Sequence, residues 1–301
     1  MPLAVSPRLR AAVVIALLLG AGPAAAVESV SPVPTTRDLG ASGRDARRRA
    51  LAAVPLDRLP EADRRAVEKC LRSHTIHRRL PVETVTCDAE LVDFVLTRPE
   101  VLVDVWRVLG ISRLSLDPTG PRQWRLADGY GTVGTVRLLH HERWAAGGVL
   151  VFHGRGGYTG PLSPRDLTGS CLVIVRHAPA PADADGRPRQ AVQIDAFLDV
   201  DGLGLELVTR ALQPLIIHSA AANLHEIALF VSQFAAAAER NPAAVARLAG
   251  RMSRTAPEDR RALVELAAGN VADSASDEAE DVQASLAARW MPVEQLDALR
   301  R

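Results

Sequence analysis

The chain has one lysine (Lys69), few aromatic residues and no excess of either charge. Its 36 basic and 35 acidic residues leave a formal net charge of +1, and aromatic residues are 4% of the 301. A chain so balanced has no basic field to attract nucleic acid or an anionic membrane. We therefore expect no nucleic-acid partner. Hydrophobic residues make up 48%, which is enough for a sizeable core.

Several catalytic and binding motifs are also missing. No G-x-S-x-G nucleophile elbow is present. The glycine-rich stretch 154–160 lacks the Lys-Ser/Thr pair of a phosphate-binding loop, and no helix pattern follows it. We interpret it as a wide turn or β-bulge, in which Arg155 and Tyr158 could lie at the rim of a pocket.

The histidines do not have the spacing of a metal site. His218 and His225 are seven residues apart on one predicted helix, about 10 Å along its axis. His140 and His141 are neighbours on a predicted strand and so point to opposite faces. We expect no metal and no cofactor, and surface or core positions for these side chains.

Cysteine is scarce: the chain has Cys70, Cys87 and Cys171. In an oxidising compartment, Cys70 and Cys87 are the candidates for a disulfide because they are close in sequence. Cys171 lies in an apolar run and is interpreted as a buried small hydrophobe. The alternative is three free, buried thiols.

The N-terminus resembles a secretory signal peptide over residues 1–26. Arg8 and Arg10 precede an unbroken apolar run at 11–19, and three alanines follow at 24–26. The run is too short to span a bilayer comfortably, and no later segment has enough uninterrupted apolar residues. We expect an exported protein, periplasmic or secreted, with no stable transmembrane anchor after cleavage.

Composition divides the rest of the chain into three parts. We expect residues 27–58 to be a flexible or weakly helical spacer, because their first part is rich in Ser, Pro, Thr and Gly. Residues 59–252 predict a domain with a preceding helix. Residues 253–301 predict a helical and acidic C-terminal tail.

The central region predicts strands bounded by helices. A short strand at 81–87 precedes two helices, 89–96 and 99–109, the second of which ends at Gly110. Six segments then have strand character. They are 112–116, 122–127, 132–142, 149–154, 167–177 and 190–200. In the last, Asp195 falls on the side opposite Val192 and Ile194, which we interpret as the solvent face.

One long apolar stripe follows the strands, with alternating spacings of three and four that predict an α-helix. Its members are Ile217, Ala220, Leu224, Ile227, Val231, Phe234 and Ala238. Pro214 predicts a division into a short helix over 205–212 and a long one from 215 to 239.

This order of elements resembles the START-like, or helix-grip, superfamily, which includes the polyketide cyclase and lipid-transfer families. The resemblance covers about residues 76–240. It implies an α+β fold in which a curved antiparallel sheet wraps around the long C-terminal helix, here with helical N- and C-terminal extensions. It also implies a cavity between sheet and helix that often holds an apolar ligand.

The leading hypothesis is a non-enzymatic protein that binds an apolar small molecule or lipid in this cavity. Side chains that could contact the ligand are Trp106, Trp124, His153, Arg155, Tyr158, Leu224 and Ile227. A second hypothesis is a cyclase-like enzyme, which an inward-facing His153, Arg176 or His177 would favour. A third is an envelope protein with a filled core and a docking surface. The sequence names no catalytic residue and no protein partner.

Overall fold

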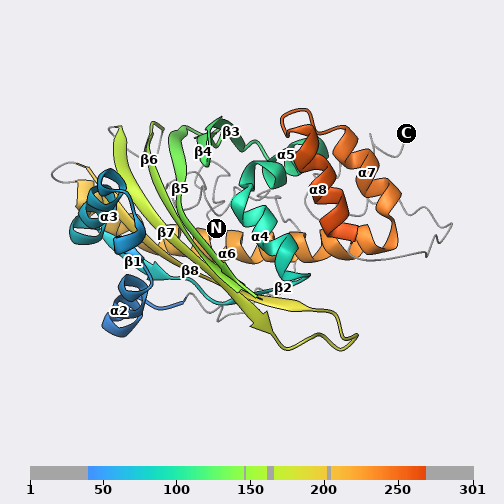
Figure 1. Ribbon diagram of the computed structural model, residues 1–301. Coiled ribbons are helices and arrows are strands. Elements are labelled where there is room, and N and C mark those ends of the chain that lie inside the picture. The colour runs from blue at the N-terminus through green and yellow to red at the C-terminus, as the bar shows by residue number, and fades with distance from the viewer. Residues whose placement is uncertain (1–39, 146, 161–165, 202–204, 269–301) are drawn as a thin grey trace, which may run out of the picture.

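The computed structural model describes residues 40–145, 147–160, 166–201 and 205–268. These residues form an open, curved antiparallel sheet with helices on both faces (Figure 1). Six of the strands follow one another without an intervening helix, and helices precede and follow them, which is an α+β arrangement. The predicted signal peptide and the last part of the predicted tail lie outside the described residues.

Eight strands make up the sheet, and its order is β1-β8-β7-β6-β5-β4-β3, with β2 also paired to β8. The strands are β1 (Ile76–Arg79), β2 (Glu83–Thr86), β3 (Ser115–Gly120), β4 (Gln123–Ala127), β5 (Thr132–Trp144), β6 (Gly147–Tyr158), β7 (Leu167–Ala180) and β8 (Arg189–Val200). β3 to β8 form a meander, and the two short first strands return to pair with the last one. The six predicted strand segments are confirmed, with shifted ends.

The inner face of the sheet is covered by three helices: α4 (Ala89–Thr97), α5 (Pro99–Leu109) and α6 (Leu205–Arg240). Their apolar residues share one core with inward side chains of the sheet. Gly110 ends α5 in the left-handed conformation (φ 72°), as predicted.

α6 runs without a break through Pro214, so the predicted division into two helices is wrong. One proline removes one helical hydrogen bond, at a cost of about 3 kcal/mol or more in a helix interior. Burial of the apolar stripe offsets this cost: six of its seven residues are buried, and Ile227 is partly buried.

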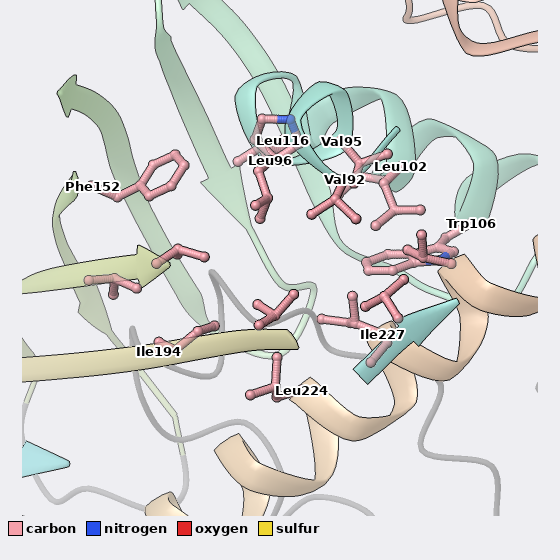
Figure 2. Close-up of a pocket in the computed structure, with 18 of the residues that line it drawn as sticks. Val92, Val95, Leu96, Leu102, Trp106, Leu116, Phe152, Ile194, Leu224 and Ile227 are labelled. Carbon is pink, nitrogen blue, oxygen red and sulfur yellow. The ribbon is translucent and has the colours of Figure 1, made fainter. Parts of the chain in front are cut away.

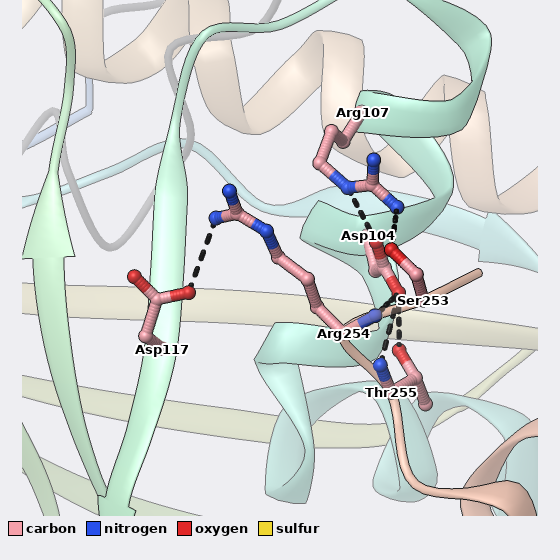
Figure 3. A network of polar contacts seen from close by, with 6 residues as sticks. All are labelled: Asp104, Arg107, Asp117, Ser253, Arg254 and Thr255. Atoms are coloured by element: carbon pink, nitrogen blue, oxygen red, sulfur yellow. Dashed lines mark hydrogen bonds and ion pairs between the residues drawn. The ribbon is translucent and has the colours of Figure 1, made fainter.

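α7 (Pro242–Gly250) and α8 (Pro257–Ala268) pack beyond the end of α6, near α4 and α5 (Figure 1). Met252, Leu263 and Ala267 belong to the inner core, which therefore continues past residue 252. The loop between α7 and α8 is fixed by Asp104 of α5, whose carboxylate accepts hydrogen bonds from the backbone amides of Arg254 and Thr255 (Figure 3).

The outer face of the sheet is covered by α2 (Arg44–Ala52), the 3₁₀ turn η2 (Leu56–Arg58) and α3 (Glu61–Ser73). They form a second, smaller core with outward side chains of β6, β7 and β8, among them Leu172, Ile174 and Phe197. Asp195 also points to this face and is fully buried, so its predicted solvent position is wrong. The alternation was correct, but helices cover the second face.

The glycine-rich stretch at 154–160 is strand rather than turn up to Tyr158, because β6 pairs continuously with β5 and β7 there. A Cβ on Gly156 would lie 2.5 Å from the carbonyl oxygen of Val133. The glycines therefore allow two strands to approach closely, and Arg155 and Tyr158 are strand residues, not part of a loop.

The expected Cys70–Cys87 disulfide is absent, and all three cysteines are free and buried. Cys70 lies in the outer core and Cys87 in the inner core. Since the sheet separates these two cores, closeness in sequence does not bring the two sulfur atoms together.

Candidate functional site

An apolar pocket lies within the inner core, between the sheet, the α4–α5 pair and α6 (Figure 2). Leu224 and Ile227 of α6 face it from one side, and Val92 and Leu102 from the other (Figure 2). The full lining is Val85, Val92, Val95, Leu96, Pro99, Leu102, Val103, Trp106, Leu114, Leu116, Phe152, Val173, Val175, Val192, Ile194, Leu224, Ile227, Ala228 and Val231. In the part of the chain that the structure describes, no charged side chain lines the pocket.

The cavity has a volume of about 120 Å³. An apolar cavity of about 150 Å³ can stay free of water and bind one benzene ring. Pockets for drug-sized ligands are larger, at roughly 300–1,000 Å³. As it stands, the pocket has room for one ring or a short hydrocarbon segment.

Part of the lining is accessible to solvent. Leu96, Pro99 and Leu102, at the junction of α4 and α5, are only partly buried, and so is Ile227 on α6. Phe152, Val173 and the other strand residues of the lining are buried. The partly exposed side chains indicate that the pocket opens between the α4–α5 junction and α6.

The structure brings together three of the predicted ligand-contacting residues, Trp106, Leu224 and Ile227. Trp124 is buried in the inner core but is not part of the lining. Tyr158 is buried at the end of β6, away from the lining.

Two of the predicted residues lie elsewhere on β6. Arg155 is exposed and pairs with Asp201 at 3.5 Å. His153 lies opposite Arg137 on β5, and it shares the outer side of β6 with Val151 of the outer core. Arg155 was predicted on a loop and His153 at an inward position of a strand, but in continuous β6 both side chains point away from the pocket.

Sequence reasoning missed the contribution of α4 and β7, in particular Val92, Leu96, Val173 and Val175. Helical and strand periodicity did place these residues in a core. Periodicity has the same form in a filled core and in a pocket wall, so it could not separate them.

The side chains that would favour an enzyme do not enter the pocket. Arg176 pairs with buried Asp195 on the outer face. His177 does point to the inner side of β7, but it lies beyond Val175 and contacts polar neighbours instead. None of the described residues that line the cavity is a nucleophile, a general acid or a general base.

These polar neighbours form what we call the histidine cluster: Asp93 of α4, His141 of β5, His177 of β7 and Gln190 of β8. The Asp93 carboxylate oxygen Oδ1 lies 2.7 Å from His141 Nε2 and 3.7 Å from His177 Nε2. Asp93, His177 and Gln190 are all at most 7% exposed. Within the described residues, His177 Nε2 is buried with no hydrogen-bond partner.

Two irregular features of the backbone create this cluster. A β-bulge between Leu138 and His140 shifts the register of β5 against β6, so that His141 pairs with inward-facing Leu150. Without the extra residue, strand alternation would turn His141 to the outer face. Gly148 leaves space for the ring of His177, because a Cβ there would lie 2.8 Å from Nε2.

Burial lowers the pKa of His177 from its ordinary value, against the opposing effects of Gln190 and Asp93. Desolvation penalises the imidazolium, so the neutral ring is favoured near neutral pH. The prediction that neighbouring His140 and His141 point to opposite faces is confirmed: His140 lies 3.5 Å from Glu142 across the sheet from Asp93.

Among the described residues, no group of three His, Cys, Asp or Glu side chains is placed to hold a metal ion. The same part of the chain has no helix long and apolar enough to cross a membrane.

Comparison with known proteins gives little further information. No family model and no curated protein matches the chain. Among solved structures, an uncharacterized protein from Rhizobium leguminosarum is similar over 51% of this chain and 95% of its own, at 16% identity and a TM-score of 0.28. A similarity this low carries no argument about fold or function.

Proposed function

We propose that this is an exported, non-enzymatic protein of helix-grip type that binds a small apolar molecule, or the apolar end of a lipid, in the pocket between sheet and α6. The observation that carries the proposal is the pocket itself, a cavity of about 120 Å³ with a lining of apolar and aromatic side chains. Binding there would remove apolar ligand surface from water, at about 25 cal/mol per Å².

The chemistry of the lining also favours this proposal over the enzyme and filled-core hypotheses. An enzyme needs polar groups at the reacting atoms, and none of the lining residues is charged. A protein with a filled core would have no such cavity. Leu96 and Ile227, partly exposed at the opening, offer an entry route to an apolar group.

The first experiment is native mass spectrometry of the chain purified without detergent. An adduct that organic solvent removes, and that is identified as a lipid or another apolar molecule, supports the proposal. Binding is then measured by ¹⁹F NMR with 4-fluorotoluene, which matches the cavity in size. Competition with octanoate and palmitate distinguishes a site for rings from one for acyl chains.

The matched variants are Ile227→Trp and Leu229→Trp. Both residues are partly buried on α6, but only Ile227 lines the pocket. We expect the indole at 227 to fill the opening and weaken 4-fluorotoluene binding at least about tenfold, which is about 1.4 kcal/mol. Leu229→Trp should bind like the parent chain. Equal binding by both variants, or no uptake of any apolar probe, would overturn the proposal.

A further inference from the structure

The histidine cluster is not needed to explain the fold. Its placement depends on a β-bulge and a glycine, and it leaves a buried imidazole nitrogen without a partner. A buried polar atom without a hydrogen-bond partner destabilises the fold. Bulges that re-aim a side chain are common beside functional sites.

Its position connects it to the pocket. Asp93 follows Val92 on α4, His177 lies two residues beyond Val175 on β7, and Gln190 lies two residues before Val192 on β8. All three valines line the pocket. A change in the separation between Asp93 and His177 would therefore move α4 relative to the strands that form the opposite wall.

We propose that the histidine cluster is a proton-operated switch, in which protonation of His177 draws α4 toward β7 and narrows the apolar pocket. This inference rests on the proposed function for its effect on ligand, but the movement itself does not. Neutral His177 Nε2 is 3.7 Å from Asp93 Oδ1, which is too long for a hydrogen bond. A protonated ring would donate to the carboxylate at about 2.7–2.9 Å, which requires a shift of about 1 Å.

The groups facing His177 fix the direction of the effect. Asp93 on α4 is the anion, and His141 on β5 is the other titratable group. Gln190 on β8 is neutral, and Gly148 of β6, which has no side chain, lies against the ring. The side chain of His141 is 17% exposed, so solvent reaches this edge of the cluster.

The sign follows from linkage. Burial lowers the pKa of His177, so the folded protein takes up this proton at a lower pH than the unfolded chain does. The stability that neutral His177 contributes is present at pH values above the pKa of an unfolded histidine, about 6.5. It is lost as the pH falls through the pKa of His177 in the folded protein. The switch therefore operates below about pH 6.5, and acid is the state with the narrowed pocket.

The test uses the full chain and follows it from pH 8 to pH 5. Without ligand, NMR follows the imidazole of His177 and the methyl groups of Val92, Val175 and Val192. With 4-fluorotoluene, ¹⁹F NMR gives the affinity. We expect the methyl signals to titrate together with His177, and the affinity to fall about fivefold at acid pH, the lower end of typical coupling between sites.

His177→Gln keeps a neutral polar side chain but cannot titrate, and it should abolish both changes. His225→Gln is the control, because His225 pairs with Glu83 outside the cluster and should change neither. If His177→Gln does not fold, His141→Gln replaces it. Because His141 lowers the pKa of His177, its removal should move the transition of His177 to higher pH.

The outcomes separate the two proposals. Absence of 4-fluorotoluene binding at every pH contradicts the proposed function, while the methyl titration still decides whether the switch exists. Affinity that is equal at pH 8 and pH 5, with methyl signals that do not follow His177, overturns the switch and leaves the proposed function standing.

Discussion

Asp195 is a fully buried carboxylate that two arginines share on the outer face of the sheet. Arg79 donates from Nε and Nη2 at 3.0 and 2.9 Å, and Arg176 donates from the neighbouring strand. Burial by itself raises the pKa of Asp195, but the His77 ring 3.5 Å away, the hydrogen bonds from Arg79 and the nearby positive charges outweigh it and hold the pKa below its usual value. The carboxylate therefore stays ionised and neutralises part of this positive charge.

Replacing Asp195 with Asn should destabilise the fold by about 3 kcal/mol, because removing one partner leaves buried charge without compensation. Urea denaturation at pH 7 measures the effect. Asp45→Asn is the control, because the pair of Asp45 with Arg48 is at the surface, and its midpoint should not change. The destabilisation by Asp195→Asn should vanish in acid. A carboxyl group whose pKa is lowered by folding stabilises the fold at pH values above its unfolded pKa, and this stabilisation is lost as the pH falls through its folded pKa. Equal midpoints for the two variants at pH 7 would contradict this account.

Periodicity predicted which side of its strand Asp195 occupies, but not that the side is buried. The information lies in residues 44–73, far away along the chain, where Ala50, Val67 and Cys70 face the sheet. For Leu224 and Ile227, by contrast, the helical spacing of three and four residues was enough to predict a position in the core. The cluster of His141 and His177 was missed because its formation depends on a one-residue bulge, which no pattern in β5 indicates.

At the level of secondary-structure elements, Asp104 joins α5 to the loop between α7 and α8. The residue is 2% exposed and accepts hydrogen bonds from Arg107 Nε at 2.7 Å and from the backbone amides of Arg254 and Thr255 at 3.0 Å (Figure 3). The Thr255 hydroxyl donates a further bond at 2.9 Å. One carboxylate thus satisfies donors from two segments about 150 residues apart in sequence.

Asp104→Asn should therefore loosen α8 from the helices that line the pocket. The amide of Asn has one accepting oxygen and a donating NH2 group in place of the second oxygen, so buried donors would lose their partner, and we expect a loss of about 2–3 kcal/mol. Hydrogen exchange should accelerate in α8 more than in the central strands. Asp117→Asn removes the exposed contact with Arg254 in the same region and should have little effect. Unchanged exchange in α8 would show that apolar packing alone holds it.

Element boundaries were the less predictable part of the fold. The strand predicted at 112–116 stops before Pro118 and Gly120, whereas β3 continues to Gly120 and the chain turns at Pro121 and Arg122, the latter with φ 54°. Proline and glycine mark a local preference, and tertiary packing overrides it at Pro214 and Gly156. The long helix and the strand order carried stronger signals because each depends on many residues at once.

At the scale of the whole molecule, one sheet separates two cores of unequal size. The outer core joins α2, η2 and α3 to three strands, while the inner core includes most of the buried residues of the sheet and of α4 to α8. Hydrophobic stabilisation scales with buried apolar area. Detaching α2, η2 and α3 from the sheet should therefore require less free energy than unfolding the sheet itself.

The three free cysteines can measure this difference. Burial raises the pKa of each thiol to about 12, so none should react while it remains packed. Cys70 of α3 reports the outer core, and Cys87 and Cys171 report the inner one. With iodoacetamide in low urea and peptide mass spectrometry, we expect Cys70 to react faster and with a weaker dependence on urea, because detaching two helices exposes less surface than global unfolding. Cys87 and Cys171 should share one slower rate. If all three rates and slopes coincide, the two cores unfold as a single unit, and the sheet with both helical layers is one cooperative structure.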